Sequence, residues 1–451
     1  MSLKKIIWIA VFIASSLSIS HSASANEVSS VNPVIGSSSG EWQKTVGVLT
    51  TQPLWVDRDA YDSSHILMVP MHYAFVTNDL DGIKQFEGLM SKFARQELPG
   101  GQLKESQWMY FVTRYLSLKA EFGIPFGRND SYLLQRASAW LHSRWIYEPA
   151  FQWGQLPLIG TQARMKLIYS KSKKWPASYY PAIRDYELFL FAAASDITFI
   201  NHQQPETLKL NSTEVNASIK ALTAEGVKAV RSRGEFTRDG GWIFQKGMFS
   251  DHADYIFAGN HEVRDDLKEK RIPDIAEDSS HSSRWPLWFR SMISAANESP
   301  ENRAALLKAY HGYSLQFSRH VVVIKDKSVL LNNFMDGRNG VYRYRYATTG
   351  SNEILGHGPY SLSGILGQSW YPFLSGVSTI YSVYENSYPL SKSTVELYVG
   401  PNTTRSRNPL FVWPRFFTDG FSQLIAQQSS FLSRCYKLDK TGSPQVVCQQ
   451  D

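Results

Sequence analysis

The chain contains little cysteine and no long apolar run beyond its first residues. Only Cys435 and Cys448 occur among 451 residues, so a small scaffold stapled by several disulfides is excluded. No later stretch has the roughly 20 consecutive apolar residues that a membrane-spanning helix needs. We therefore expect no stable membrane insertion once the N-terminal segment has been removed.

Charge of one sign is not concentrated in the chain either. Lys and Arg number 47 against 40 Asp and Glu, for a net charge of +7, yet the basic residues are scattered and form only short runs such as 170–175. Nucleic-acid-binding proteins usually gather Lys and Arg in one stripe, so no nucleic-acid partner is expected. A scattered basic excess is compatible with an acidic polysaccharide or with an anionic envelope surface.

Residues 1–25 have the features of a secretory signal peptide. Two lysines precede an apolar core over residues 6–19, and the small residues at 23–25 form a cleavage pattern. An uncleaved anchor or a lipoprotein is the alternative, although no cysteine lies near the cleavage position. We expect an exported protein that is periplasmic or extracellular.

The two cysteines flank one short segment that contains a Gly-Ser-Pro turn. In an exported protein such a pair is typical of a disulfide, which predicts a Cys435–Cys448 bond that clips the C-terminal residues 431–451. Its stabilisation would be about 3 kcal/mol in the chain-entropy model. Two free thiols or a metal pair are the alternatives, but no histidine lies nearby to complete a zinc set.

Helical periodicity dominates the chain from about Tyr61 onward, after a Ser-, Val-, Gly- and Asn-rich segment at 26–57 that is expected to be a loose N-terminal lead. The helical segments are 81–98, 105–123, 129–148, 179–202, 212–234, 282–297, 299–324, 361–376, 378–390 and 416–434. Short strands are expected at 320–326 and 395–400. Since a βαβ pattern and fixed-length repeats are absent, the sequence predicts an all-α fold. An α/α toroid of antiparallel helix hairpins over 58–430 is favoured, with an open α-solenoid as the alternative.

A dense group of polar and aromatic residues between positions 239 and 262 is the first candidate site. Asp239 and two glycines form a turn before Trp242. A helix is expected from His252 onward, which would place His252 and Tyr255 on one face because they are three residues apart. Asn260 and Glu262 follow a glycine that would end this helix.

A second candidate stretch, 278–290, begins with Asp278, a natural helix N-cap. His281, Arg284, Trp285 and Trp288 have the spacing of one helix face. This face would present an imidazole, a guanidinium and two indoles to a ligand. A structural role is the alternative, with the arginine stacked on tryptophan and the histidine bonded to a carbonyl.

The layout resembles that of exported polysaccharide lyases built on an α/α toroid, such as the chondroitin, hyaluronan and alginate lyases. Many of them have an Asp-Gly-Ser-aromatic turn followed by His and Tyr, and Asp239-Gly240-Gly241-Trp242 is similar to that turn. The resemblance gives His252 and Tyr255 the His and Tyr places, and it gives Arg284 the Arg place. It implies cleavage of a uronic-acid polymer by β-elimination.

The chemistry of elimination explains why these residue types are needed. The C5 proton of a uronate is weakly acidic, so Arg or Asn must neutralise the neighbouring carboxylate, and His or Tyr must take the proton. No cofactor is required. The predicted catalytic residues are His252, Tyr255, Asn260, His281 and Arg284, and the predicted substrate-binding residues are Asp239, Trp242, Glu262, Trp285 and Trp288.

Other functions remain open at this point. Hydrolysis would need two carboxylates, with candidates Asp239, Asp251, Asp254, Glu262 and Asp278. A uronyl C5-epimerase or a non-catalytic envelope polysaccharide-binding protein would use a similar groove. A metal could be held by His252, Asp254, His261 and Glu262, although their order matches no strong metal signature, so no metal is expected. Further rim residues could come from Asn333, Asp336, Arg338, Asn339, Tyr342, Arg343, His357 and Tyr360, for which a plain surface loop is the alternative.

Overall fold

The computed structural model describes residues 35–51, 57–154, 157–170, 174–345, 356–401 and 415–448. The predicted signal peptide at 1–25 lies outside these ranges. The described chain is mostly helical, which confirms the predicted all-α class, and its strands form only two-stranded antiparallel pairs. Within these ranges, no helix combines the length and the apolar character needed to cross a bilayer.

The first half of the chain is built from successive helices with short connections. They are α1 (Gly40–Trp42), η1 (Gln43–Gly47), α2 (Val48–Thr51), α3 (Asp57–Ile66), α4 (Met68–Val76), α5 (Leu80–Phe93), α6 (Gln102–Glu121), α7 (Arg128–Ile146), α8 (Thr161–Ile168), α9 (Asp185–Gln203), η2 (Pro205–Leu210) and α10 (Thr213–Arg233). Strands β1 (Pro149–Ala150) and β2 (Leu158–Ile159) pair between α7 and α8.

The second half alternates helices with irregular segments. Its helical elements are η3 (Ser282–Arg284), α11 (Trp285–Ala295), η4 (Ala296–Glu298), α12 (Pro300–Gln316), η5 (Phe317–Val321), η7 (Ser363–Gly367), η8 (Tyr371–Phe373), α13 (Ser378–Asn386), α14 (Lys392–Val399), α15 (Arg415–Thr418) and α16 (Phe421–Cys435). Three hairpins pair β3 (Gly234–Phe236) with β4 (Trp242–Phe244), β5 (Val322–Lys325) with β6 (Ser328–Leu331), and β7 (Tyr436–Leu438) with β8 (Pro444–Val446).

Local sequence signals determine where several helices begin. The Ser212 hydroxyl accepts a hydrogen bond from the Val215 amide at the start of α10. Ser299 caps α12 in the same way, and Pro300 occupies the first helical position, where its missing amide proton removes no hydrogen bond. Both helix starts agree with the sequence prediction.

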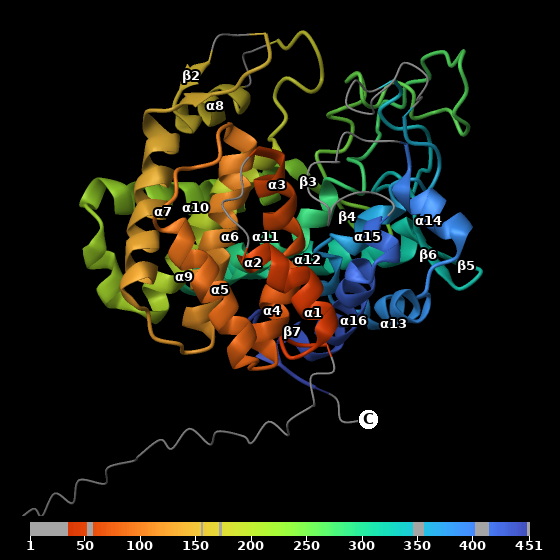
Figure 1. The fold of residues 1–451 in the computed structure, drawn as a ribbon. Coiled ribbons are helices and arrows are strands. Elements are labelled where there is room, and N and C mark those ends of the chain that lie inside the picture. The colour runs from red at the N-terminus through yellow and green to blue at the C-terminus, as the bar shows by residue number, and fades with distance from the viewer. Residues whose placement is uncertain are drawn as a thin grey trace, which may run out of the picture. The chain divides into compact units, whose positions relative to one another are not determined.

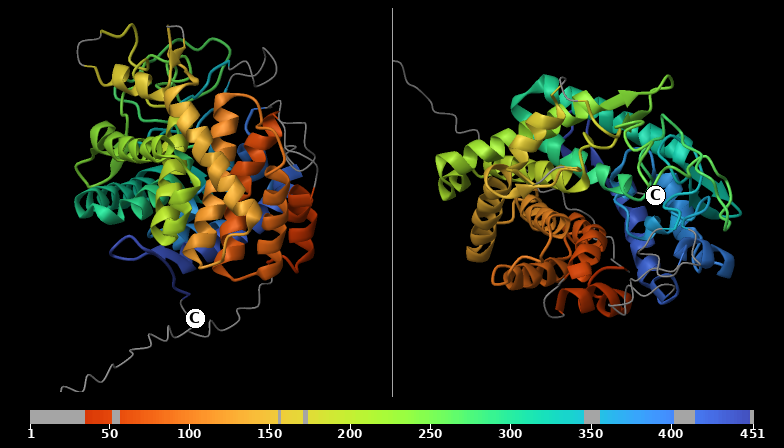
Figure 2. Two further views of the ribbon diagram at one scale, coloured as in Figure 1. Left: turned by 90° about the vertical axis from the view of Figure 1, so that its left-hand side faces the viewer. Right: turned by 90° about the horizontal axis from the view of Figure 1, so that it is seen from above.

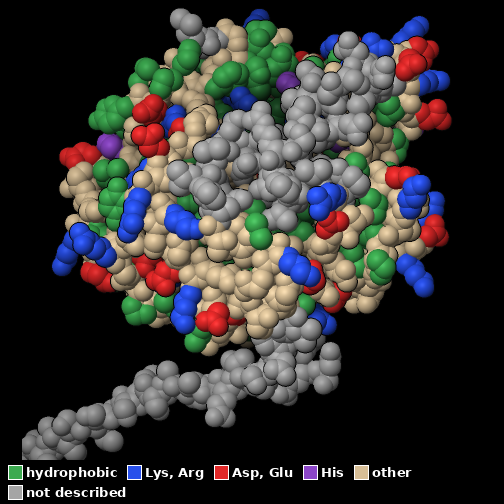
Figure 3. Space-filling model, viewed as in Figure 1, with side chains coloured by type: hydrophobic (Ala, Val, Ile, Leu, Met, Phe, Trp, Pro, Cys, Tyr) green, Lys and Arg blue, Asp and Glu red, His purple; other side chains and the backbone are tan. Residues whose placement is uncertain are grey.

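The core is centred on α9, which packs against α6, α10 and α11 (Figure 1, Figure 2). Large aromatic side chains fill this contact. The Phe189 ring of α9 lies 5.1 Å from the Trp288 ring of α11 and 5.8 Å from the Tyr110 ring of α6. Much of the high aromatic content is therefore core packing. Acidic and basic side chains are interspersed over the face shown in Figure 3.

Residues 40–51 correct the expectation of a loose lead over 26–57. They form α1, η1 and α2, and the side chains of Trp42, Val46 and Leu49 are fully buried. The Trp42 indole donates a hydrogen bond to Gln85 and packs edge-on against Phe86 of α5. Tertiary packing orders a segment whose own pattern is weak.

Other elements differ from the sequence prediction in type. Residues 245–281 consist of turns, bends and irregular backbone, so the helix expected from His252 is absent there. Residues 395–400, expected as a strand, belong mostly to α14, whose start is capped by Ser391. Residues 361–376 form the short 3₁₀ turns η7 and η8 in place of a regular helix. The strand expected at 320–326 is present as β5.

The two cysteines lie on either side of the C-terminal hairpin. Cys435 ends α16, and Cys448 follows β8. Both are free thiols. The two cysteines approach each other to 2.9 Å. The Val447 amide donates to the Cys435 carbonyl and extends the hairpin pairing. The backbone thus brings the two side chains together without a covalent bond.

A buried ion pair joins the two central helices. Arg114 of α6 donates to Asp196 of α9 over 2.7 Å, and the side chains are 2% and 0% exposed. Glu121, also on α6, lies 3.3 Å from the same guanidinium. Removing one partner of such a pair leaves a buried charge without full compensation.

We expect Asp196→Asn to lower the free energy of unfolding by about 3 kcal/mol. The matched control is Asp266→Asn, which removes an exposed carboxylate 3.9 Å from Arg264 and should cause no measurable change. Urea unfolding followed by circular dichroism gives both values. Equal stability of the two variants would contradict a central role for the Arg114–Asp196 pair.

Candidate active site

Two adjoining cavities form one cleft beside the loop 245–281. The larger has a volume of about 390 Å³ and the smaller of about 260 Å³. Leu103, His281 and Arg343 line both of them, so the cavities are adjacent. We refer to the pair as the cleft.

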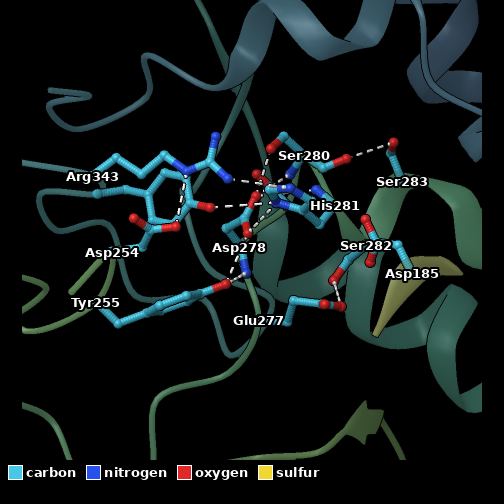
Figure 4. Close-up of polar contacts among 12 residues, drawn as sticks. Asp185, Asp254, Tyr255, Glu277, Asp278, Ser280, His281, Ser282, Ser283 and Arg343 are labelled. Carbon is cyan, nitrogen blue, oxygen red and sulfur yellow. Dashed lines mark hydrogen bonds and ion pairs between the residues drawn. The ribbon is translucent and has the colours of Figure 1, made fainter. Parts of the chain in front are cut away.

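Asp278 is the fully buried acceptor around which the cleft residues are arranged (Figure 4). Its carboxylate accepts hydrogen bonds from the Tyr255 hydroxyl at 2.9 Å and from His281 Nδ1 at 2.7 Å. The amide and hydroxyl of Ser280 and the amide of His281 also donate to it. Burial alone would raise the pKa of Asp278, but the charge and hydrogen bond of His281 outweigh it, and the pKa falls well below its usual range.

The contact with Asp278 also favours the protonated form of His281. Burial would lower its pKa, but the Asp278 carboxylate outweighs this effect, and the pKa of His281 is raised. Arg343 Nη2 lies 3.3 Å from His281 Nε2 on the other side of the ring and opposes the shift. The side chain is 25% exposed, so it remains accessible from the cleft.

His252 lies in the same cleft, but its pKa is shifted in the opposite direction. Burial lowers its pKa, and the guanidinium groups of Arg343 and Arg184 lower it further, which outweighs the Asp254 carboxylate. Asp254 Oδ2 is 3.9 Å from His252 Nδ1. The rings of Trp153 and Tyr179 pack against this imidazole. His252 is therefore held as a neutral imidazole at neutral pH.

Side-chain to backbone contacts hold the loop that carries His252. The Gln245 amide donates to the Ile183 carbonyl and accepts from the Ile183 amide. The Asp251 carboxylate accepts from the amide and hydroxyl of Ser178. These contacts tie the loop to the segment that leads into α9, because Ile183 lies just before that helix. These long-range contacts therefore place His252 opposite Arg184.

Tyr255 and Arg343 bring two further loops to the cleft. The Tyr255 ring belongs to a small buried cluster with Phe334 and Tyr342. Burial raises the pKa of Tyr255 well above its usual value, and the Asp278 charge adds to this. The Arg343 Nε donates to Asp254 at 3.1 Å, while the Arg343 amide donates to the Asp254 carbonyl. Tyr255 is thus a neutral phenol whose hydroxyl donates a hydrogen bond to Asp278.

Glu277 adds a proton-bearing carboxyl to the smaller cavity. Burial raises its pKa to about 8, and the charges of Asp185 and Asp278 contribute to the shift. The Ser282 hydroxyl donates to its carboxyl group at 2.8 Å. Glu277 is consequently protonated at neutral pH.

Arg284 lies at the wall between the core and the larger cavity. It forms an ion pair with Asp185 at the start of α9 and donates to the Tyr61 hydroxyl. Only 3% of the residue is exposed. It lines the larger cavity together with His281, so two of the residues predicted from the 278–290 stretch do converge.

The other predicted site residues lie elsewhere. Asn260 donates to the carbonyls of Phe257 and Lys268 and so holds its own loop together. Glu262 is exposed. Asp239 sits at the β3–β4 turn, where it accepts from Thr237 and contacts His320. None of the three is among the described residues that line the cleft.

The tryptophans predicted to bind substrate are core residues. Trp242, Trp285 and Trp288 are at most 1% exposed. The Trp285 ring lies 5.2 Å from Trp242 and 5.4 Å from Trp288. The substrate-binding prediction for them is therefore wrong, because β4 places Trp242 and α11 places Trp285 and Trp288 in the helical core. The preceding His281 and Arg284 reach the cleft.

Several cleft residues were missed or left undecided by the sequence. Glu277, Asp185, Arg184 and Trp153 line the smaller cavity without belonging to a recognisable motif. Arg343 and Tyr342 were considered as rim residues and do line it. Asn333, in contrast, is fully buried and bonds to the carbonyls of Gly340 and Gly358. Asn339 and Asp336 likewise accept hydrogen bonds from nearby backbone amides.

The metal arrangement considered from the sequence does not assemble. His261 and Glu262 are exposed, whereas His252 and Asp254 line the cleft. Across the described ranges, no group of three or more His, Cys, Asp or Glu side chains is placed to bind a metal ion.

No protein-family model, curated protein or solved structure matches this chain.

The His281–Asp278 contact predicts a pH-dependent stability. Because the folded pKa of His281 is raised, its stabilisation is fully present below the unfolded value of about 6.5 and is lost as the pH rises through the folded pKa. We expect the stability difference between the wild type and His281→Gln to shrink from pH 6 towards pH 9, measured by urea unfolding. The exposed His261→Gln is the control and should follow the wild-type profile; a constant difference for His281→Gln would contradict the assignment.

Proposed function

We propose that this protein is an exported lyase that cleaves an acidic, uronic-acid-containing polysaccharide by β-elimination in the cleft. The observation that carries the proposal is the placement of His252 and His281 around one cavity together with Arg184 and Arg343. The pKa of His252 is lowered, and the pKa of His281 is raised. Titratable groups whose pKa values are pushed apart are the usual pattern of an acid–base pair.

His252 is the proposed base, and the neighbouring arginines are the proposed carboxylate holders. Arg184 and Arg343 line the smaller cavity with His252. A uronate carboxylate bound there would be neutralised, which stabilises the enolate-like anion that forms when the C5 proton leaves. The same binding event would screen the two charges that lower the pKa of His252. Substrate binding would therefore make His252 a stronger base.

His281 is the proposed acid. Its contact with Asp278 favours the imidazolium form, which can donate a proton to the departing sugar oxygen. The hydroxyl of Tyr255, the other candidate base from the sequence, donates a hydrogen bond to Asp278, and this buried carboxylate disfavours a phenolate. Geometry thus favours His252 over Tyr255 as the base and gives Tyr255 a positioning role.

The proposal includes the α/α-toroid arrangement, in which the site lies on loops at one rim. Its support is the origin of the lining residues. They come from the irregular loop 245–281, from the segment before α9, and from the first turns of α6 and η3. Loops and helix starts supply most of the lining, and Tyr61, Asp62 and His65 of α3 complete the larger cavity.

The test is incubation of the mature protein with alginate, hyaluronan and pectate. Elimination creates a C4–C5 double bond conjugated to the carboxylate, so ultraviolet absorbance should rise. His252→Ala should slow turnover by ~10²-fold or more because it removes the proton-transfer group. The matched control, His261→Ala, changes an exposed histidine of the same loop and should cleave at the parental rate. Equal rates for both variants would remove His252 from the mechanism.

Glycoside hydrolysis is the second candidate, favoured by the protonated Glu277 in the same cleft. A carboxylic acid that keeps its proton at neutral pH is the acid catalyst that hydrolysis requires. New reducing ends without ultraviolet absorbance, abolished by Glu277→Gln, would replace the lyase with a hydrolase. A change of uronate configuration without cleavage would indicate an epimerase. Polymer retention without any product would indicate a binding protein.

We further propose that, after export, a thiol-oxidising disulfide of the exported compartment accepts two electrons and two protons from Cys435 and Cys448 and leaves them joined by a disulfide. The two residues already approach to 2.9 Å. The exported protein should then resist alkylation without reductant, as read by mass spectrometry. Two alkylated thiols would contradict the bond. Because it closes only the C-terminal hairpin, Cys448→Ser should increase proteolysis of residues after 435 without unfolding the helical core.

A further inference from the structure

Three aromatic rings pack against the guanidinium group of Arg184. Its central carbon, Cζ, lies 4.6 Å from the centroid of the Phe151 ring, 4.8 Å from that of Trp153 and 5.4 Å from that of Tyr186. Each ring attracts the cation through the negative face of its π system. We refer to these three rings as the aromatic cradle.

Polar contacts hold the cradle in place. The Tyr186 hydroxyl donates to the Phe151 carbonyl at 3.2 Å. The side-chain amide of Gln152, which is 2% exposed, donates to the Tyr180 carbonyl at 3.0 Å. These contacts join residues 151–153 to the chain on both sides of Arg184. The rings are therefore positioned before a ligand binds, which lowers the cost of ordering them.

The positive charge of Arg184 is not neutralised by an acidic partner. Across the residues that the structure describes, its guanidinium forms no ion pair and no hydrogen bond. None of its nitrogen atoms is buried without a partner either. Since Arg184 lines the smaller cavity, its N–H donors are accessible to a ligand in the cleft.

The other two arginines of the cleft differ in this respect. Arg343 pairs with Asp254 at 3.1 Å, and Arg284 pairs with Asp185. A substrate carboxylate would have to compete with these aspartates for the guanidinium groups. The uncharged rings around Arg184 offer no such competition, because a cation–π contact holds the guanidinium without neutralising it.

We propose that the aromatic cradle keeps Arg184 unpaired, so that it is the carboxylate receptor of the cleft and makes binding specific for the free uronic acid over its ester. The two oxygens of a carboxylate match the fork of N–H donors of a guanidinium. Phe151 is a positioning residue that acts through Arg184, because it does not line either cavity of the cleft. This inference deepens the proposed function and rests on it for the reaction.

The test compares tetragalacturonate with its neutral methyl ester. Both are titrated by calorimetry into the mature protein carrying His252→Ala, which prevents turnover. Arg184→Gln should weaken binding of the acid about tenfold or more at low salt and leave binding of the ester unchanged. Phe151→Leu should weaken binding of the acid about threefold, because the guanidinium loses one ring contact. Phe151→Tyr keeps a ring and should bind like the parent.

Phe236→Leu is the matched control. Phe236 is 45% exposed, against 39% for Phe151, and it also packs against a cation, Lys308, at 4.7 Å. It lies on β3 and does not line the cleft, so the same substitution should leave binding of both ligands unchanged. If Phe151→Leu weakens the acid and the ester by the same factor, or weakens neither, the positioning role is overturned.

The carboxylate receptor and the lyase can fail separately. If no polymer is cleaved by elimination but Arg184→Gln and Phe151→Leu still weaken binding of the acid alone, the receptor stands and the reaction assignment falls. If a polymer is cleaved by elimination and Arg184→Gln has the parental kcat/KM, the lyase stands and the receptor falls. Tetrasaccharides of alginate and hyaluronan are titrated in parallel, and absence of binding by all three acids would overturn the receptor.

Discussion

The buried carboxylate of Asp278 is the constraint on which the cleft depends. An ionised carboxylate that is 0% exposed can be kept only if hydrogen bonds and charge replace the lost water. The groups that satisfy it are Tyr255, Ser280 and His281. Meeting this requirement draws the loop around residue 255 and the turn at 278–281 to the same point. The cleft thus forms where these protein groups together stabilise one buried charge.

The helical core fixes the turn that carries Asp278. The Tyr371 hydroxyl donates to the Ser279 carbonyl, and the Tyr313 hydroxyl of α12 donates to the Ser282 carbonyl. The Ser279 amide in turn donates to the Asn333 carbonyl. Aromatic residues that are part of the core therefore hold, through their hydroxyls, the backbone that presents His281. Stability of the core and geometry of the cleft are linked through these contacts.

The parts that could be predicted from the sequence are those controlled by local signals. Periodicity located α6, α9 and α10, and the Ser299-Pro300 pair located the start of α12. Residues 245–281 form turns held by contacts from distant segments, such as Gln245 with Ile183, so a local pattern suggested a helix that is absent. The shared face proposed for His281, Arg284 and Trp285 also broke down, because α11 begins only at Trp285.

The two histidines show why the chemistry of the cleft needed three-dimensional information. Each has an aspartate within three residues, yet the Asp278 contact to His281 is 2.7 Å, whereas Asp254 is 3.9 Å from His252. Arg343 binds Asp254 and competes for its charge, so burial determines the sign for His252 and the carboxylate determines it for His281. A carboxylate bound at Arg343 would weaken the Arg343–Asp254 ion pair. The charge of Asp254 would then raise the pKa of His252 more strongly. Arg343 lowers the pKa of both histidines, so an anion bound by this guanidinium would raise both pKa values.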